Sequence, residues 1–478
     1  MRQFTRSFVL TFAALCLIIG AAVVGQASPA LQEDPFATNT LRPNLQPEDQ
    51  VDPFATNTLA VTLTPSRTLA PSATPTATFT LTPTFTPTLT PTRTPTPTLT
   101  PTPTPTPNGP FEYPEGVSPL TGLAYPNQQA RERRNLIVKI SNYPAVVRPQ
   151  SGMNAADVVW EYEVEGGVTR FAAIFRSQSP DHVGPVRSGR LMDLQLVPMY
   201  QALFSYSGAS APVQSLLLDA PWALQIVSPA VGDNCEEAGF CRFPQDGLAF
   251  EHTLYVDTNL VWDRATARGV NTGYRARGFA FGETPDDGGT PATDVFIDWY
   301  GQTDARWQWD AAAERYVRFT DGVAHFDAAA DEQLWTDNIV IVEAVHEERP
   351  DLFEEESRSA SQQINMWGNG RAYVFRDGQY YAGFWERRCR DVPPDITPTP
   401  TPAPNITSPC YTEPGDALRI YYGDNQSILM KPGRTYVEVT RWLGNVTVGT
   451  TQADMSGTMT VLAQSATPTN TMTPTAAP

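Results

Sequence analysis

The sequence predicts an α+β protein made of an N-terminal domain of α/β type and a mostly antiparallel β domain, with a disordered Thr/Pro-rich stalk and tail. Strand and helix patterns alternate in residues 111–285, which is typical of mixed layers. Alternating aromatic and β-branched runs fill residues 292–462, which favours antiparallel strands. The other long stretches are so rich in Thr and Pro that they can contribute little to a core.

The N-terminus has the pattern of an export signal. Arg2 and Arg6 precede an apolar run over residues 8–24, and small residues follow it, so we expect a signal peptide of residues 1–27. The run is just long enough to make an uncleaved N-terminal membrane anchor the alternative. Cys16 follows a bulky leucine and makes a poor lipidation site. We therefore expect an extracellular or cell-envelope protein, membrane-anchored if the signal is uncleaved.

A disordered Thr/Pro-rich linker is expected over residues 28–110. It contains a near-exact repeat of DPFATNTL, followed by an almost pure Thr/Pro stretch. Alternating Pro favours an extended polyproline stalk, and dense Thr beside Pro resembles stalks that carry O-linked sugars. The same composition returns in an insert at residues 396–404 and in a tail at residues 463–478.

Several short elements are expected in the N-terminal domain. An apolar run predicts a buried strand, and two β-rich runs around Gly166 and Gly167 predict a hairpin. An apolar stripe after Ser188 predicts a helix that Pro198 disturbs near its end. In order, the elements are a strand at 136–140, hairpin strands at 157–163 and 168–176, a helix from Ser188, a strand at 202–206 and a helix at 213–218.

The β domain is expected to consist of short strands separated by tight turns. Turns are predicted at Asp321-Gly322 and at Asp377-Gly378. The strands are expected at 295–299, 307–309, 316–319, 339–342, 371–375 and 436–439.

Four cysteines lie in the two domains, and an even number in an exported chain predicts disulfides. The spacing suggests that Cys235 bonds to Cys241 and Cys389 to Cys410. A zinc site would need four thiolates to converge in a reducing compartment, so we expect neither a metal nor a cofactor. The formal net charge of −18 disfavours binding to nucleic acid.

Several blocks of sequence carry a family resemblance. In the first domain these are SPLTGL, RPQSG, AADVVWEYEVEGGVTRF and GPVRSGR, and in the second they are WDAAAERYVRFTDGVAHFD, NIVIV, GNGRAYVFRDGQYYAGFW and MKPGRTYVEV. The two sets resemble the N-terminal and C-terminal domains of the YerB-like family of exported bacterial proteins. This resemblance implies a two-domain envelope protein, in a family without an established activity. Members of that family are commonly lipoproteins, whereas this N-terminus lacks a convincing lipidation site.

The run from Arg148 to Arg190 carries the candidate binding residues. Glycines there let a backbone approach a ligand, and arginines offer rigid forks of donors for carboxylate, phosphate or sugar oxygens. Strand alternation would place the carboxylates of the EYEVE run on one face. The alternative is a solvated or internally paired strand face. The predicted ligand-binding residues are Arg148, Glu161, Glu163, Arg170, Arg187 and Arg190.

No motif fixes a chemical reaction. The candidates for catalysis are Glu161, Glu163 and His252, because carboxylates and an imidazole that titrates near neutrality can transfer protons. A lone histidine between apolar neighbours is, however, more often a packed residue. Asp157 and Asp193 are expected to orient arginines rather than to bind a metal. Tryptophans of the β domain could stack on sugar rings, although core packing is their commoner role.

These features favour a binding module over an enzyme. We expect the N-terminal domain to bind a polar ligand, either a cell-wall component or an envelope protein, while the stalk displays it. The alternative is a hydrolase or transferase that acts on cell-wall glycan or peptide. In that mechanism Glu161 or Glu163 and His252 act as acid and base, and Arg187 or Arg190 binds an anion.

Overall fold

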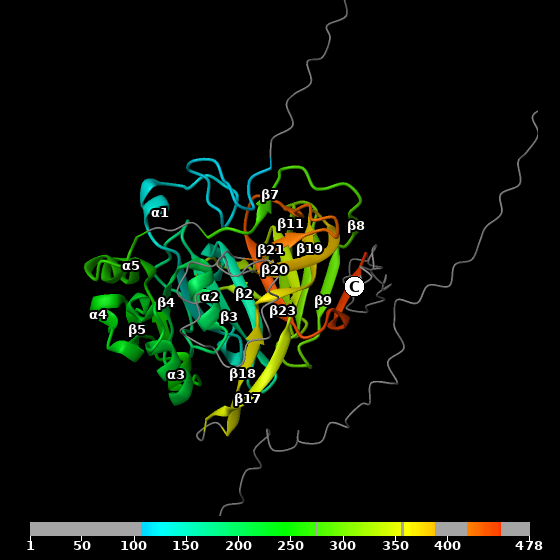
Figure 1. Ribbon diagram of the computed structural model, residues 1–478. Coiled ribbons are helices and arrows are strands. Elements are labelled where there is room, and N and C mark those ends of the chain that lie inside the picture. Colours follow the sequence, from blue (N-terminus) through cyan, green and yellow to red (C-terminus); the bar gives the residue numbers. More distant parts are fainter. Residues whose placement is uncertain (1–106, 273–275, 355–357, 388–417, 451–478) are drawn as a thin grey trace, which may run out of the picture. The chain divides into compact units, whose positions relative to one another are not determined.

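The computed structural model describes residues 107–272, 276–354, 358–387 and 418–450 (Figure 1). The expected signal peptide, insert and tail lie outside these residues, as do Cys389 and Cys410. Of the expected linker, only residues 107–110 are described, and Asn108 there pairs with Phe281 instead of being disordered. Within the described part of the chain, no helix is long and apolar enough to cross a bilayer.

One sheet takes strands from both expected domains. Its strands are β1 (Leu136–Ser141), β2 (Val158–Val164), β3 (Val168–Phe175), β4 (Leu203–Ser205), β8 (Thr290–Pro291), β16 (Asn338–Glu343), β19 (Gly368–Arg376), β20 (Gln379–Arg387), β21 (Arg419–Tyr421) and β23 (Thr435–Thr440). The ten-stranded sheet has the order β21-β20-β19-β16-β23-β2-β3-β1-β4, with β8 paired to β20. Because β23 pairs in parallel with both β2 and β16, the sheet is continuous between the two halves of the chain.

Six strands of this sheet end at the same edge. β4 is parallel to β1, and both β1 and β2 are antiparallel to β3, which lies between them. β23 and β16 continue in the direction of β2. β20 has this direction too, because β19 is antiparallel to both β16 and β20. The carboxyl ends of β1, β2, β4, β16, β20 and β23 therefore lie along one edge, which we call the carboxyl edge.

Both faces of the sheet are covered, which explains why β1, β2 and β23 are buried at every position. One face, with Trp160 and Tyr162, packs against helices α2 (Asp193–Tyr200) and α3 (Ala211–Leu218). The other face packs against a second sheet, and the buried Trp299 and Trp307 belong to the core of that face. This six-stranded sheet contains β9 (Asp294–Ile297), β10 (Ala305–Asp310), β11 (Arg315–Thr320), β12 (Val323–Ala324), β15 (Trp335–Thr336) and β24 (Val446–Gly449).

The remaining elements are short pieces around these two sheets. Helices are α1 (Gln128–Glu132), α4 (Cys235–Ala238) and α5 (Thr258–Ala267), and single 3-10 turns are η1 (Ala145–Val147), η2 (Met153–Ala155), η3 (Ala223–Gln225), η4 (Pro229–Val231), η5 (Phe250–His252) and η6 (Leu443–Asn445). Two-stranded pairs are β5 (Phe240–Arg242) with β6 (Leu254–Val256), β7 (Ala280–Phe281) with β22 (Leu429–Met430), β13 (Phe326–Asp327) with β14 (Glu332–Gln333), and β17 (Val345–Glu354) with β18 (Ser359–Asn365).

The helix expected from Ser188 begins instead at Asp193. The carboxylate of Asp193 accepts a hydrogen bond from the Arg190 backbone N–H (2.7 Å), and a turn at residues 191–192 leads from the loop into the helix. Pro198 lies inside α2, and the helix ends at Gln201 with a φ of 46°. The other expected strands and helices are present, with shifts of a few residues at their ends.

The disulfide expected between Cys235 and Cys241 is present and joins α4 to β5. Figure 1 shows α4, α5 and β5 grouped together beside the strands of the N-terminal half. Strands dominate the described residues and the helices are short, so the predicted α+β class is confirmed in outline.

Candidate functional site

Three of the four predicted arginines meet at the carboxyl edge. Arg170 lies near the start of β3, opposite Tyr162 near the end of β2. Arg187 and Arg190 lie on the loop before α2. This loop runs beside the carboxyl end of β4, where the Ser207 backbone N–H donates to the Arg187 carbonyl (3.0 Å). We call Arg170, Arg187 and Arg190 the arginine cluster.

The arginine cluster has one carboxylate partner for its three guanidinium groups. Arg190 forms an ion pair with Glu165 in the turn of the β2–β3 hairpin. Arg170 and Arg187 each donate to a backbone carbonyl, at 3.1 and 3.2 Å, and neither forms a salt bridge with a described carboxylate. The Nε of Arg187 is buried without a hydrogen-bond partner. The described residues therefore leave part of the cluster's positive charge and several of its N–H donors unsatisfied.

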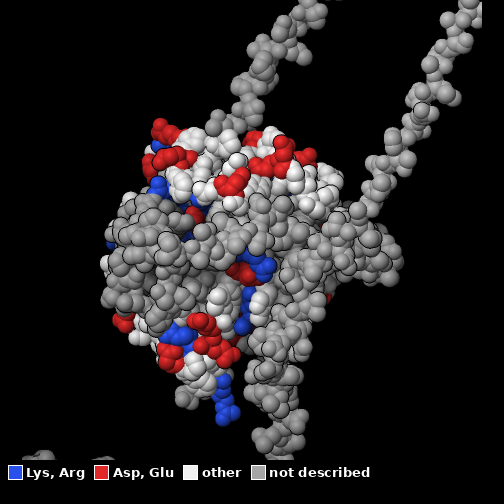
Figure 2. All heavy atoms as spheres, turned by 45° about the vertical axis from the view of Figure 1, so that its right-hand side comes forward, with Lys and Arg blue, Asp and Glu red and all other residues white. Residues whose placement is uncertain are grey.

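The three arginines repel one another. Burial lowers the pKa of Arg170 well below its usual value, and the charges of Arg190 and Arg187 lower it further. Burial also lowers the pKa of Arg187, where Glu251 opposes the shift and Arg190 adds to it. All three side chains remain half-buried, so solvent reaches them. The chain carries a net charge of −18, so three neighbouring cations with one carboxylate partner depart from its overall balance. Acidic side chains gather along the upper rim of the face in Figure 2.

A buried polar group lies beneath the arginine cluster. Lys139 on β1 lies 3.2 Å from the Asp193 carboxylate and contacts the Tyr162 hydroxyl, which in turn donates to Asp193 (2.7 Å). Burial lowers the pKa of Lys139 to about 8, although Asp193 opposes the shift. Asp193 therefore pairs with a lysine and not with the arginine that the sequence suggests. Because Asp193 also holds the Arg190 backbone, this group fixes the loop while leaving the arginine charges uncompensated.

His252 lies close enough to the arginine cluster for the charge of Arg187 to affect its pKa. It is buried in η5, and burial followed by the charge of Arg187 lowers the pKa of its imidazole. Its Nδ1 has no hydrogen-bond partner, and its Nε2 lies 3.9 Å from the Glu251 carboxylate. Throughout the described residues, this region included, no three His, Cys, Asp or Glu side chains are placed to hold a metal ion.

The other predicted site residues lie apart from the arginine cluster. Arg148 pairs with Asp321 (2.7 Å). Glu163 pairs with Arg441 (2.7 Å), which follows it by 278 positions in the sequence. Glu161 is fully buried on the opposite face of the sheet from Tyr162. No described contact joins Glu161 or Glu163 to His252, so the acid and base of the hydrolase alternative are not brought together.

Glu161 belongs to a buried charged network between the two sheets. It lies opposite Glu438 in the parallel pairing of β2 with β23, and we call these two residues the buried carboxyl pair. Arg318 on β11 contacts both, at 2.7 Å from Glu161 and 3.2 Å from Glu438. The Trp307 indole N–H donates to Glu438 (3.1 Å). Burial raises the pKa of Glu438 well above its ordinary value, and the nearby charge of Glu161 raises it further.

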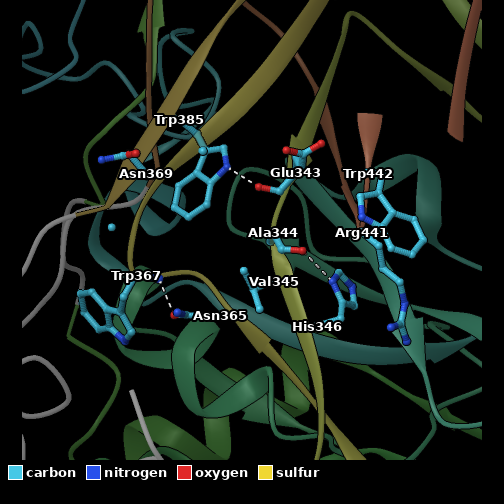
Figure 3. A pocket seen from close by; sticks show the side chains of 12 residues that line it. Glu343, Ala344, Val345, His346, Asn365, Trp367, Asn369, Trp385, Arg441 and Trp442 are labelled. Carbon is cyan, nitrogen blue, oxygen red and sulfur yellow. Dashed lines mark hydrogen bonds between the residues drawn. The ribbon is translucent and has the colours of Figure 1, made fainter. Parts of the chain in front are cut away.

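A pocket opens farther along the carboxyl edge, around the ends of β16 and β23. Its volume is about 550 Å³, and three tryptophans line it, so we call it the tryptophan pocket. Figure 3 shows Trp367 and Trp385 on one side, Trp442 and Arg441 on the other, and residues 343–346 between them. Trp367, Trp385 and Trp442 all belong to the β domain, whose tryptophans the sequence offered as sugar-stacking candidates, but no local pattern distinguished Trp442 from the others.

Comparison with known proteins identifies two family segments. The N-terminal domain of a protein of unknown function, DUF3048, matches residues 120–271, and the C-terminal domain of the same family matches residues 295–399. Both segments contribute strands to the ten-stranded sheet, whereas its central strand β23 lies beyond the second match.

A relative and a solved structure agree with these matches. The chain is 29% identical over 274 residues to the "Putative lipoprotein YerB" of Bacillus subtilis (strain 168), which covers 56% of this chain and 78% of that protein. The crystal structure of YerB from Bacillus subtilis is 24% identical, with a TM-score of 0.54, and the match covers 70% of this chain and 99% of the other. That likeness shows a shared fold. With both domains matched in the same order, the chain belongs to the YerB-like family.

Proposed function

We propose that this protein is an exported binding module of the cell envelope that holds an anionic ligand on the arginine cluster. One observation carries the proposal: of three neighbouring, half-buried guanidinium groups, only that of Arg190 has a carboxylate partner among the described residues, in a chain of net charge −18. A structural role for arginine is usually served by pairing it with a carboxylate, as Arg148 and Arg441 are paired here. Unpaired and mutually repelling arginines instead favour an anion supplied from outside.

The position of the arginine cluster also supports ligand binding. Ligands of open sheets with parallel strands bind outside the carboxyl ends of those strands, where loops converge. Here the loop that carries Arg187 runs beside the end of β4, with the Gly189 backbone N–H donating to the Gly208 carbonyl (2.8 Å). Guanidinium forks match the paired oxygens of phosphate and carboxylate groups. We therefore propose a cell-wall component, or an envelope protein, that presents phosphate or carboxylate groups.

Replacing Arg187 with alanine is expected to weaken anion binding by about 10- to 100-fold, the usual worth of a hydrogen bond to a charged group. Calorimetric titration of the full chain with inorganic phosphate, acetate and a poly(glycerol phosphate) chain measures the affinity and separates phosphate from carboxylate recognition. Arg131→Ala is the matched control, because it removes the same charge from an exposed pair with Glu115. Wild-type binding should weaken with added salt.

Thermal unfolding separates this binding role from a structural one. Arg187→Ala removes a charge that its neighbours repel, so the variant should unfold at a temperature no lower than wild type, and phosphate should raise the midpoint of the wild type only. A lower midpoint together with unchanged titrations would mean that Arg187 serves the fold. Failure of the wild-type chain to bind any of the three probes would count against the proposed function.

A further inference from the structure

The tryptophan pocket differs in chemistry from the arginine cluster. Its charged residues are already paired within the protein: Glu343 with Arg371 (2.7 Å), and Arg441 with Glu163 (2.7 Å). The pocket therefore offers aromatic rings and neutral polar groups, but little unpaired charge. An ion finds little opposite charge to bind in such a site. An uncharged polar molecule, by contrast, can contact both the aromatic rings and the neutral polar groups.

The rings of the pocket are held in place, and one of them is left exposed. The Trp385 indole N–H donates to the Glu343 carbonyl (2.8 Å), and the ring of Trp367 stacks against the Arg387 guanidinium at 3.7 Å. These two side chains are buried, whereas Trp442 keeps 54% of its surface exposed. An exposed indole beside a cavity of about 550 Å³ provides a flat apolar surface on which a ligand can stack.

Glycine makes room for this arrangement. A Cβ atom at Gly370 would lie 2.5 Å from the Trp385 ring nitrogen and 2.6 Å from the Glu343 carbonyl, so only glycine allows the indole to lie against this backbone. Gly368 has a φ of 91°, which other residues rarely adopt. The short run GNG at the start of β19 therefore shapes the wall of the pocket.

Neutral hydrogen-bonding groups lie between the rings. The Nδ1 of His346 donates to the Ala344 carbonyl (2.9 Å), so its Nε2 is an acceptor, and that atom is buried in the pocket wall without a partner. Burial lowers the pKa of His346 to about 4, which keeps the ring neutral. The Asn365 side-chain oxygen accepts from the Trp367 backbone N–H (3.0 Å), and its amide nitrogen has no hydrogen-bond partner among the described residues.

We propose that the tryptophan pocket binds an uncharged pyranose ring of a glycan chain. The apolar face of the sugar stacks on Trp442, and its hydroxyl groups bond to Nε2 of His346 and to the amide of Asn365. A pyranose combines one flat apolar face with a rim of neutral donors and acceptors, which matches what the pocket presents. A lipid chain would leave these polar groups without partners. The site is separate from the arginine cluster, so either proposal can fail without the other.

Trp442→Ala tests the proposal. Calorimetry measures the binding of the N-acetylglucosamine tetramer and of cellotetraose to the full chain. Comparing the two affinities shows whether the pocket recognises the N-acetyl group. We expect wild type to bind at least one of them. Trp442→Ala should weaken that binding at least about tenfold, and Trp442→Phe should retain most of it. His346→Leu, which removes the buried acceptor, should also weaken it.

The controls distinguish stacking from a general change in the protein. Phe111→Ala removes another exposed aromatic ring (46% exposed) and should leave sugar binding unchanged. Thermal unfolding verifies that each variant folds, and phosphate titrations of Trp442→Ala should match wild type. Failure of wild type to bind either tetrasaccharide, or equal binding by Trp442→Ala and wild type, overturns the proposal.

Discussion

Replacing Arg318 with methionine is expected to lower the free energy of unfolding by about 3–5 kcal/mol. Arg318 is fully buried and is the cation that contacts both Glu161 and Glu438, so its loss leaves the buried carboxyl pair without a counter-charge. Removing one partner of a buried ion pair is costly because the remaining charge stays desolvated. Methionine retains most of the aliphatic part of the arginine side chain. The decrease in the free energy of unfolding therefore reflects the missing charge more than lost packing. Urea unfolding followed by tryptophan fluorescence measures it.

Two further variants show whether the lost stability comes from the uncompensated buried charge. Arg131→Met breaks an exposed pair with Glu115 and should cost at most about 1 kcal/mol. The triple variant Glu161→Gln, Arg318→Met and Glu438→Gln should recover most of the loss, since neutral side chains of similar volume often replace a buried ionic group without cost. An Arg318→Met loss no larger than that of Arg131→Met would mean that water, and not Arg318, solvates the pair.

The local parts of the fold were predictable from sequence, and the long-range parts were not. The β2–β3 hairpin follows from two β-rich runs around adjacent glycines, because residues close in sequence decide it. The place of β23 between β2 and β16 depends on a segment beyond the Thr/Pro insert, and no local pattern reveals which strands it joins. The start of α2 was predicted too early because Ser188 lies in a loop, and a turn at residues 191–192 leads from that loop into the helix.

The residues of the candidate site also divide into those that the sequence predicted and those that it did not. Arg170, Arg187 and Arg190 were predicted together because they lie close in sequence and in the same motif-rich run. Lys139 was missed because it lies in the apolar run LIVKI, where a single polar residue gives no signal of its role. The alternation of β2 correctly separates Glu161 from Tyr162, but the cations that pair with Glu161 and Glu163 come from distant parts of the chain.

The two proposed sites lie along one carboxyl edge and differ in chemistry. Residues of the β2–β3 hairpin contact both sites. Glu165 in its turn pairs with Arg190 of the arginine cluster, and Glu163 near the end of β2 pairs with Arg441 of the tryptophan pocket. A glycan polymer that carries anionic substituents has both chemistries in one chain. If both proposals hold, a ligand with a pyranose ring and a phosphate or carboxylate should bind more tightly than either fragment alone, because the second contact becomes intramolecular.

Replacing Glu438 with glutamine is expected to change how stability depends on pH. Burial, and then the charge of Glu161, raise the folded-state pKa of Glu438 well above its ordinary 4.5. The native protein therefore holds a proton that the unfolded chain has already lost. The stabilising contribution of this carboxyl is complete below pH 4.5 and is lost as pH rises through the folded-state pKa. Between the unfolded-state and the folded-state pKa of Glu438, the titration of this carboxyl lowers the free energy of unfolding by about 1.4 kcal/mol per pH unit.

Glutamine can take the place of the protonated carboxyl. Its oxygen can accept from Trp307 and Arg318, and its amide N–H can donate to Glu161, as a proton on Glu438 would. Glutamine does not titrate, so Glu438→Gln should match wild type near pH 5 and become progressively more stable than wild type towards pH 8. Urea unfolding at both pH values measures the difference, in which the titration of all other groups cancels. Glu332→Gln, at a surface pair with Arg315, should show no such growth. A Glu438→Gln difference that stays constant across this range would mean that Glu438 is ionised in the native protein, and Arg318 would then neutralise two carboxylates instead of one.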